Sequence, residues 1–270
     1  MFELTLRLRT DNDPPTAFLP SIMLWYLLLI AAGFLAGIVN TIAGGGSFLT
    51  LPALMVFGLD PQLANGTNRV AVLFSSASAT LTYHKHGHLD RKAAWRLTIP
   101  TMLGVPAGAL LAINLPASTF EGIFGALFLA MAVLLISDPK RLTRKTESKD
   151  RSPTLMFAIF FGIGVYVGFI QAGMGILLLL AMSLIKSGDL VASNAVKNLI
   201  GFLVTLTAMI VFLLYGMIDW IPGLVMAVGN VFGGIVGAKL AIAKGNRLIF
   251  GFLIVVMVAT GIKLVTSAIL

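Results

Sequence analysis

The sequence predicts an all-α polytopic membrane protein made of two inverted repeats, each with a broken or re-entrant half-helix near the bilayer midplane. Three observations predict this fold class: an apolar composition, short apolar segments that follow glycine clusters, and similarity between the two halves of the chain. Of the 270 residues, 58% are hydrophobic and 11% are charged, and the mean hydropathy is +0.97. Because about a quarter of the residues in soluble domains are charged, the composition excludes an ordinary soluble protein.

Breaks in the apolar runs divide the chain into ten expected helices. In order, they cover residues 22–42, 47–57, 69–84, 98–113, 119–136, 155–171, 174–186, 198–215, 222–242 and 248–269. Eight of them approach or reach the roughly 20 residues that cross a bilayer. The segments 47–57 and 174–186 are too short, since a helix over 47–57 extends only about 16 Å. We expect these two segments to be half-helices.

The first expected helix, 22–42, also has features of the apolar core of a signal peptide. Two observations argue against that interpretation. The apolar run continues to Ile42, and the second half has an equivalent segment, 155–171, that is internal and cannot be a signal. We therefore expect 22–42 to stay in the protein as a membrane helix.

The two halves are similar when each residue is compared with the one 129 positions further on. The residues that interrupt the apolar runs match. Apolar residues can match by chance in such a chain, but glycine, Asp and Asn are less expected to do so together. The matching pairs include Ala43 and Ala172, Gly44 and Gly173, Gly46 and Gly175, Asp60 and Asp189, Asn65 and Asn194, Gly104 and Gly233, Gly108 and Gly237, and Gly122 and Gly251. This pattern indicates an internal duplication.

Basic residues predict how the repeats are oriented, because cytoplasmic loops carry an excess of Lys and Arg. A basic loop around His88 and the linker 137–153 flank two expected spans, so both are placed in the cytoplasm. The turn 216–221 has no Lys or Arg and is placed outside, although it is equivalent to the first basic loop. The two halves therefore run in opposite directions. The N-terminus is placed outside, against the evidence of Arg7 and Arg9.

We expect four parts in the chain. They are an N-terminal extension over 1–21, a first repeat over 22–136, a basic cytoplasmic linker over 137–153 and a second repeat over 154–270. The linker has six basic residues and no apolar period, which is typical of a solvated connection. No segment is left for a separate soluble domain.

The glycine clusters before the half-helices are the first candidate site, because many secondary transporters build their substrate site from such breaks. A half-helix that starts there presents unpaired N–H groups and the positive end of its dipole, which favour an anion. The candidates are Gly44, Gly45, Gly46 and Ser47 in the first half and Gly173 and Gly175 in the second. Alternatively, the glycines only allow close contact between helices. Asn40 and Gln171, on the first helix of each half, can complete a polar cavity or form hydrogen bonds between helices.

Two polar clusters, 65–69 and 194–198, form a second candidate, and each is expected to open a span. A cation at a helix start opposes the dipole, so we expect Arg69 to have a partner such as an oxyanion, to which guanidinium offers paired donors. Lys197 offers a point charge. Alternatively, both side chains snorkel to the membrane interfaces. The candidate residues are Asn65, Asn68, Arg69, Asn194, Lys197 and Asn198.

Other functions are not expected. The chain contains no cysteine, which excludes disulfides and cysteine-ligated metals. The tract with His84, His86, His88 and Asp90 has basic neighbours, which favour a solvated loop over a metal site. No span carries the residues of a hydrolytic centre and no phosphate-binding loop occurs, so we expect no enzyme, no cofactor and no ATP-driven transport. The net charge of +8 is explained by topology, so nucleic acid is not an expected partner.

Several motifs follow the order seen in a known family. They are Gly33-Phe34-Leu35-Ala36-Gly37, Ala43-Gly44-Gly45-Gly46-Ser47, Leu51-Pro52, Ala64-Asn65-Gly66-Thr67-Asn68-Arg69, and the pair Gly104 and Gly108. Over about residues 25–266 the chain resembles the sulfite exporter TauE/SafE family. The resemblance implies a multi-pass transporter of a bacterial-type inner membrane that moves sulfite, sulfoacetate or related organosulfonates, usually outward. It also implies that the candidate residues at the breaks of both halves line the pathway.

We therefore expect a secondary transporter that exports a small sulfur-containing anion by alternating access. Two alternatives are open: transport of another ion, such as a carboxylate or a metal cation, and a membrane scaffold that transports nothing. The expected partners are the anionic substrate and the lipid bilayer. The sequence leaves open which anion is carried, the direction of flux, the coupling ion and the oligomeric state.

Overall fold

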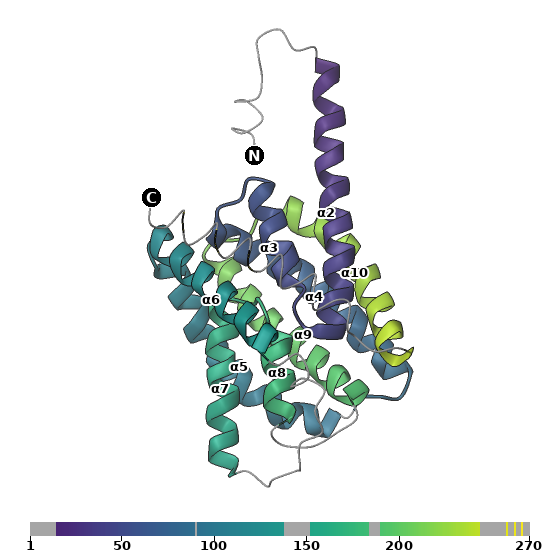
Figure 1. Ribbon diagram of the computed structural model, residues 1–270, viewed down its shortest axis with the longest axis vertical. Coiled ribbons are helices and arrows are strands. Elements are labelled where there is room, and N and C mark those ends of the chain that lie inside the picture. The colour runs from purple at the N-terminus through teal and green to yellow at the C-terminus, as the bar shows by residue number, and fades with distance from the viewer. Residues whose placement is uncertain are drawn as a thin grey trace.

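The computed structural model describes residues 15–89, 91–137, 152–183 and 190–243, together with Val258, Ile262 and Thr266. The helices in chain order are α2 (Pro15–Ala43), α3 (Ser47–Val56), α4 (Pro61–Lys85), α5 (Arg91–Asn114), α6 (Ala117–Ser137), α7 (Pro153–Phe169), α8 (Met174–Ser183), α9 (Leu190–Leu214) and α10 (Trp220–Ala243) (Figure 1). These described ranges contain no strand. The predicted all-α fold is confirmed.

Five of the described helices are long and apolar enough to cross a membrane. The apolar stretches are Ile22–Ala43, Ala94–Asn114, Ala117–Leu134, Val191–Leu214 and Trp220–Ala243, in α2, α5, α6, α9 and α10. The apolar helices α3 and α7 are shorter. α4 has 25 residues but carries several buried polar side chains. Together with the composition, these helices support a multi-pass membrane protein.

Four helices begin earlier than the apolar runs predict. α2 begins at Pro15 rather than at 22, α4 at Pro61 rather than at 69, α5 at Arg91 rather than at 98, and α9 at Leu190 rather than at 198. The prediction placed each start at a long apolar run, whereas a helix can begin among polar residues and continue into one. The start of α4 shows this, because Pro61 follows an extended Asp60 and proline is favoured at the first position of a helix.

α3 and α8 are the predicted half-helices, with 10 residues each. Each follows a break that contains a glycine in the left-handed conformation, with φ 78° at Gly44 and φ 73° at Gly173. Other residues rarely adopt this backbone conformation, so glycine lets the chain turn into the half-helix. Before the second break, Ile170 is extended, with φ −144° and ψ 131°. The predicted broken helices are confirmed, and their place at the bilayer midplane stays a prediction.

Equivalent helices of the two halves have the same bounds at the predicted offset. α4 covers 61–85 and α9 covers 190–214, while α5 covers 91–114 and α10 covers 220–243. The first helix of each half packs against the other half: α2 lies along α10, and α7 lies along α5 (Figure 1). The first helix of each half is therefore packed against helices of the other half, and α4 and α9 lie between them.

α4 and α9 meet between these helices and run antiparallel. Near the start of α4, the guanidinium of Arg69 lies 4.4 Å from the ring centroid of Phe212, near the end of α9. Near the end of α4, Tyr83 packs in one buried cluster with Ala195, near the start of α9. Two equivalent helices with opposite directions are the arrangement that inverted repeats predict. The orientation of the halves relative to a bilayer stays a prediction.

Close contact between the paired helices depends on glycine. A Cβ atom at Gly108 of α5 would lie 1.8 Å from the carbonyl oxygen of Val165 in α7. A Cβ atom at Gly233 of α10 would lie 2.2 Å from the carbonyl oxygen of Phe34 in α2. No side chain fits at such distances, so the helix backbones touch directly. These spaced small residues thus let the paired helices pack closely.

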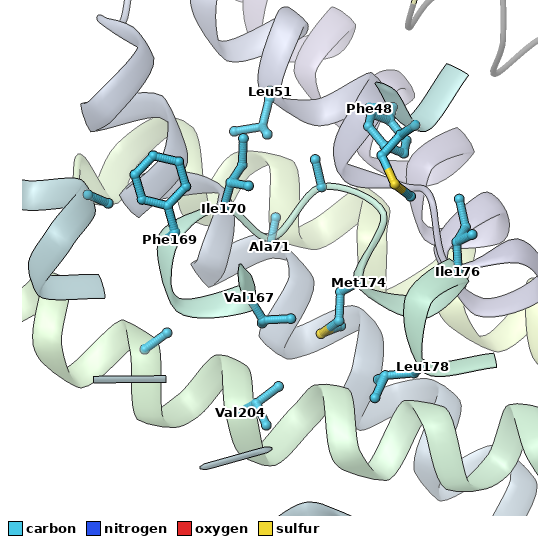
Figure 2. Close-up of a cluster of buried hydrophobic side chains, with 14 of the residues drawn as sticks. Phe48, Leu51, Ala71, Val167, Phe169, Ile170, Met174, Ile176, Leu178 and Val204 are labelled. Atoms are coloured by element: carbon cyan, nitrogen blue, oxygen red, sulfur yellow. The ribbon is translucent and has the colours of Figure 1, made fainter. Parts of the chain in front are cut away.

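Apolar side chains surround the second break (Figure 2). Val167 and Ile170 at the end of α7 belong to one buried cluster with Phe48 of α3 and Met174 of α8. Phe48 also packs edge-on against Phe128 of α6, with ring centroids 4.8 Å apart. The non-helical backbone of the break is therefore enclosed by protein, which is the condition for irregular backbone at membrane depth.

Several predicted features lie outside the described residues. They are the linker from 138 to 151, Arg7 and Arg9, Asp90, Asp189, and most of the last expected helix at 248–269. The division into four parts and the cytoplasmic side of the linker therefore stay predictions. Because α2 begins at Pro15, the first described helix reaches into the expected N-terminal extension.

Candidate functional site

The two glycine breaks are in direct backbone contact. The N–H of Gly175 donates to the carbonyl oxygen of Gly44 at 3.2 Å. A Cβ atom at either residue would lie 2.3 Å from the Cα of the other. Only glycine fits at these two positions. The alternative interpretation, in which the glycines allow close contact between segments, therefore holds for Gly44 and Gly175.

The start of α3 keeps unpaired donors. The N–H groups of Gly45, Gly46 and Ser47 have no backbone acceptor among the described residues. They lie at the positive end of the helix dipole, which favours a negatively charged partner. At the start of α8, the N–H of Gly175 is already bonded to Gly44. The two breaks therefore share a backbone design but differ in the donors that they leave free.

Every residue of the predicted site is buried. α2 holds Asn40, the first break holds Gly44, Gly45 and Gly46, α3 begins with Ser47, α4 holds Asn65, Asn68 and Arg69, the second break holds Gln171 and Gly173, α8 holds Gly175, and α9 holds Asn194, Lys197 and Asn198. The prediction that the clusters 65–69 and 194–198 open their helices is wrong. Because α4 and α9 begin at Pro61 and Leu190, the clusters lie inside the helices.

Arg69 of α4 is fully buried, with an exposed fraction of 0%. Its Nη1 donates to the carbonyl oxygen of Val167 at 3.1 Å, and its Nη2 donates to that of Gly168 at 2.7 Å. Phe212 covers one face of the guanidinium. The remaining nitrogen, Nε, is buried without a hydrogen-bond partner. Snorkelling of Arg69 to an interface is therefore wrong, because the side chain points to the end of α7.

Lys197 of α9 is bound in the same manner at the end of α2. Its Nζ donates to the carbonyl oxygens of Asn40 at 3.1 Å and Thr41 at 2.7 Å, and to Oδ1 of Asn194 at 2.7 Å. An ammonium group has three N–H donors, and all three have an acceptor here. Lys197 does not snorkel either, since its exposed fraction is 2%.

The two cations thus hold the halves together in a reciprocal way. Arg69 of the first half binds the C-terminal end of α7, and Lys197 of the second half binds the C-terminal end of α2. These ends carry the negative pole of the helix dipole and carbonyl groups with free acceptor capacity, which favour a cation. The partner predicted for Arg69 was an oxyanion, and in this structure two carbonyl oxygens take that place.

Positive charge is in excess at the site. Among the described residues, Arg69 and Lys197 are the buried charged side chains, and no carboxylate is buried with them. Asp60 is exposed, and Glu121 and Asp219 are only half-buried. Carbonyl dipoles offset part of the charge, but a buried charge without an ionic partner is unfavourable. The electrostatics therefore favour an anion.

A network of amides and hydroxyls links α4 to its neighbours on both sides. Nδ2 of Asn65 donates to the carbonyl oxygen of Phe169 at 2.9 Å. Nδ2 of Asn68 donates to Oγ of Ser47 at 3.1 Å, and Oγ1 of Thr50 donates to Oδ1 of Asn68 at 2.5 Å. The candidate residues of the first half are therefore brought together between the start of α3 and the end of α7.

Gln171 lies in the second break and not on the first helix of its half, because α7 ends at Phe169. Its Nε2 donates to Oγ1 of Thr205 on α9, so the predicted alternative of hydrogen bonding between segments is confirmed. Its Oε1, like Oδ1 of Asn65, is buried without a hydrogen-bond partner. The hydroxyl of Tyr166 donates to the carbonyl oxygen of Ala172 at 2.6 Å and steadies the same break.

Not every predicted residue joins the site through its side chain. Asn40 contributes its backbone carbonyl. Nδ2 of Asn198 donates to the carbonyl oxygen of Asn194 in its own helix, at 2.8 Å. The residues predicted from the sequence did not include Thr50, Thr205, Tyr166 or Phe212. Thr50 could have been found as a polar residue one turn after Ser47, on the same face of α3.

The histidine tract lies at the end of α4, away from this site. His84 and His86 are exposed, and His88 is half-buried. In the part of the chain that is described, no group of three His, Cys, Asp or Glu side chains is placed to hold a metal ion.

Comparison with known proteins identifies one family. Residues 29–264 match the family described as Sulfite exporter TauE/SafE. The chain is 31% identical over 239 residues to the Probable membrane transporter protein ORF9 of Sinorhizobium sp, covering 88% of this chain and 92% of that protein. It is 31% identical over 224 residues to a Probable membrane transporter protein of Haemophilus influenzae, covering 82% and 87%.

A third relative is the Probable membrane transporter protein YfcA of Escherichia coli, which is 29% identical over 239 residues, with 88% of each chain covered. No solved structure matches the chain. The alignments cover most of each relative, and all three are named probable membrane transporter proteins.

Proposed function

The chain belongs to the sulfite exporter TauE/SafE family, and from this premise we propose that it exports a small sulfur-containing anion across a bacterial-type inner membrane. The substrate class is sulfite, sulfoacetate or a related organosulfonate. Transport proceeds by alternating access between the two halves, with Arg69, Asn65, Asn68 and the start of α3 as the binding residues of the first half.

The buried guanidinium of Arg69 is the observation that carries the proposal. Guanidinium binds planar or tetrahedral oxyanions through parallel N–H groups. In a low-dielectric interior such a group requires negative partners. Arg69 has carbonyl partners on Nη1 and Nη2 and an unpartnered Nε, so the site has donor capacity left for a substrate.

The charge balance supports an anion over a metal cation. A cation would need the carbonyl oxygens at the ends of α2 and α7, and Lys197 and Arg69 already bind those oxygens. It would also meet two buried positive charges with no buried carboxylate among the described residues. An anion meets the free N–H groups at the start of α3 and reduces the excess of charge.

Export is the direction that the membrane potential favours for an anion. The interior of a bacterial cell is negative, and moving one charge down the potential releases about 2.3 kcal/mol for each 100 mV. A coupling ion is therefore not required for net export. The absence of a buried carboxylate among the described residues fits a site without a proton relay.

Flux measurements in proteoliposomes test the proposal. Radiolabelled sulfite, sulfoacetate and acetate are compared at imposed potentials for the wild type and for Arg69→Ala. Arg96→Ala is the control, because it removes an exposed arginine of α5. We expect flux of the sulfur-containing anions to follow the potential, to persist in Arg96→Ala and to be lost in Arg69→Ala. Acetate flux equal to that of sulfite would refute the substrate class, and full flux in Arg69→Ala would refute the site.

A further inference from the structure

We propose that the substrate anion and the end of α7 compete for Arg69, so that anion binding releases α7 from α4. This inference rests on the proposed function and adds how binding is coupled to the movement of the halves. In the structure, the carbonyl groups of Val167 and Gly168 in α7 occupy the guanidinium of Arg69.

The geometry at Arg69 supports exchange of one ligand for the other. Two carbonyl oxygens of consecutive residues, Val167 and Gly168, accept from Nη1 and Nη2, much as the two oxygens of a carboxylate or sulfonate do. The bonds from the guanidinium to the carbonyl groups already have a charged donor, and an oxyanion adds the attraction between opposite charges that a neutral carbonyl group lacks. An oxyanion that first binds the unpartnered Nε can therefore replace the two carbonyl groups.

If the end of α7 moves, the contact between the two breaks is affected, because it lies only a few residues further along the chain. α7 ends at Phe169, whose carbonyl oxygen is held by Asn65. The chain then passes Gln171 and Ala172 to Gly175, which donates to Gly44 of the other half. A displacement of the end of α7 is thus transmitted to the break that closes the centre of the protein.

Lys197, the equivalent buried cation at the end of α2, can be compared with Arg69. It binds the end of α2 as Arg69 binds the end of α7, but all three of its N–H donors have acceptors. It has no free donor with which an anion could begin an exchange. The anion is therefore expected to release α7 and to leave α2 in place, although the two halves share the same helix arrangement.

Cysteine labelling tests this asymmetry in a chain that contains no native cysteine. Ala172 and Ala43 are equivalent residues beside the two breaks, and each is 1% exposed. Single Ala172→Cys and Ala43→Cys variants in proteoliposomes are labelled with a maleimide, with and without sulfoacetate. Sulfoacetate is the probe because sulfite itself reacts with maleimides.

We expect sulfoacetate to speed the labelling of Ala172→Cys about tenfold, which corresponds to about 1.4 kcal/mol in the opening equilibrium. Labelling of Ala43→Cys should not change. Adding Arg69→Met to Ala172→Cys should make labelling fast without sulfoacetate. Adding Lys197→Met should accelerate only Ala43→Cys. Arg69→Lys replaces Arg69→Met if the latter does not give a monodisperse protein, since lysine keeps the charge but loses the paired donors.

The outcomes separate this inference from the proposed function. Flux of sulfoacetate with unchanged labelling of Ala172→Cys would overturn the exchange and leave the transport function intact. Equal acceleration of both cysteines by sulfoacetate would overturn the asymmetry. If sulfoacetate is not transported at all, the substrate proposal fails, and slow labelling of Ala172→Cys with Arg69→Met would then also overturn the role of Arg69 in holding α7.

Discussion

Nη2 of Arg69 lies 2.7 Å from the carbonyl oxygen of Gly168, although the two residues belong to opposite halves of the chain. The same relationship recurs between Lys197 and Thr41. Each half therefore supplies the cation that binds the broken helix of the other. Arg69 and Lys197 thus both stabilise the breaks and give the site its positive charge, and both effects can be tested by substitution.

Gly44→Ala should destabilise the protein more than Gly87→Ala. Both glycines have positive φ, 78° and 76°, so alanine at either position costs about 1–2 kcal/mol for the left-handed backbone. Only at Gly44 would the new Cβ also lie 2.3 Å from the Cα of Gly175, whereas nothing lies within 4 Å at Gly87. Thermal unfolding of the detergent-solubilised protein measures the difference. Equal losses would mean that the backbone contact between the breaks does not form.

Gly108→Ala should separate α5 from α7, whereas Gly162→Ala should be tolerated. The added Cβ would lie 1.8 Å from the carbonyl oxygen of Val165 in the first case and would meet nothing within 4 Å in the second. Because alanine has the higher helix propensity by about 1 kcal/mol, Gly162→Ala is neutral or stabilising. The thermal midpoints and the amount of monodisperse protein test the pair. A stable Gly108→Ala protein would contradict the observed packing of the two helices.

Thr50→Val should weaken the link between α3 and α4. Valine has nearly the shape of threonine but cannot donate to Oδ1 of Asn68, and a lost hydrogen bond of this kind costs about 1 kcal/mol. Thr80→Val is the matched control, because Oγ1 of Thr80 donates only to the carbonyl oxygen of Ser76 in its own helix. Thermal unfolding should place Thr50→Val below Thr80→Val, and the reverse order would count against the network.

Lys197→Met should release the end of α2. The substitution keeps the apolar length of the side chain but removes the donor of the Thr41 carbonyl oxygen and of Oδ1 of Asn194, while the Asn40 carbonyl oxygen keeps the N–H of Gly44. An unsatisfied buried group costs roughly 1–3 kcal/mol. Lys239→Met removes an exposed lysine of α10 and should leave the unfolding midpoint near that of the wild type. An unchanged midpoint for Lys197→Met would show that Lys197 does not hold α2.

The breaks and half-helices could be predicted from the chain because glycine clusters and helix length are local properties. Gly44 and Gly173 mark the ends of apolar runs, and the segments after them are too short to cross a bilayer. The early starts of α4 and α9 could not be predicted from apolar runs, since their first two turns contain the buried polar residues Asn65 and Asn194. The acceptor of Nδ2 of Asn65, the carbonyl oxygen of Phe169, is 104 positions away in the sequence.

The residues that form the buried polar cluster could also be predicted, but their hydrogen-bond partners could not. The acceptors of Arg69 and Lys197 are backbone carbonyl groups 98 and 157 positions away in the sequence. A carbonyl group has no residue signature, so its role depends on where α2 and α7 end in space. From the sequence, the alternatives for both cations were binding of an anion and snorkelling to the interface, and burial at a helix end emerged only from the packing of the halves.

The sign of the charge moved during transport tests the central claim most directly. Currents are recorded from proteoliposomes adsorbed on a solid support after a jump in sulfoacetate concentration, for the wild type, Arg69→Ala and Arg96→Ala. We expect movement of negative charge with the anion in the wild type and in Arg96→Ala, and no current in Arg69→Ala. A current of the same size and sign in Arg69→Ala would contradict this expectation.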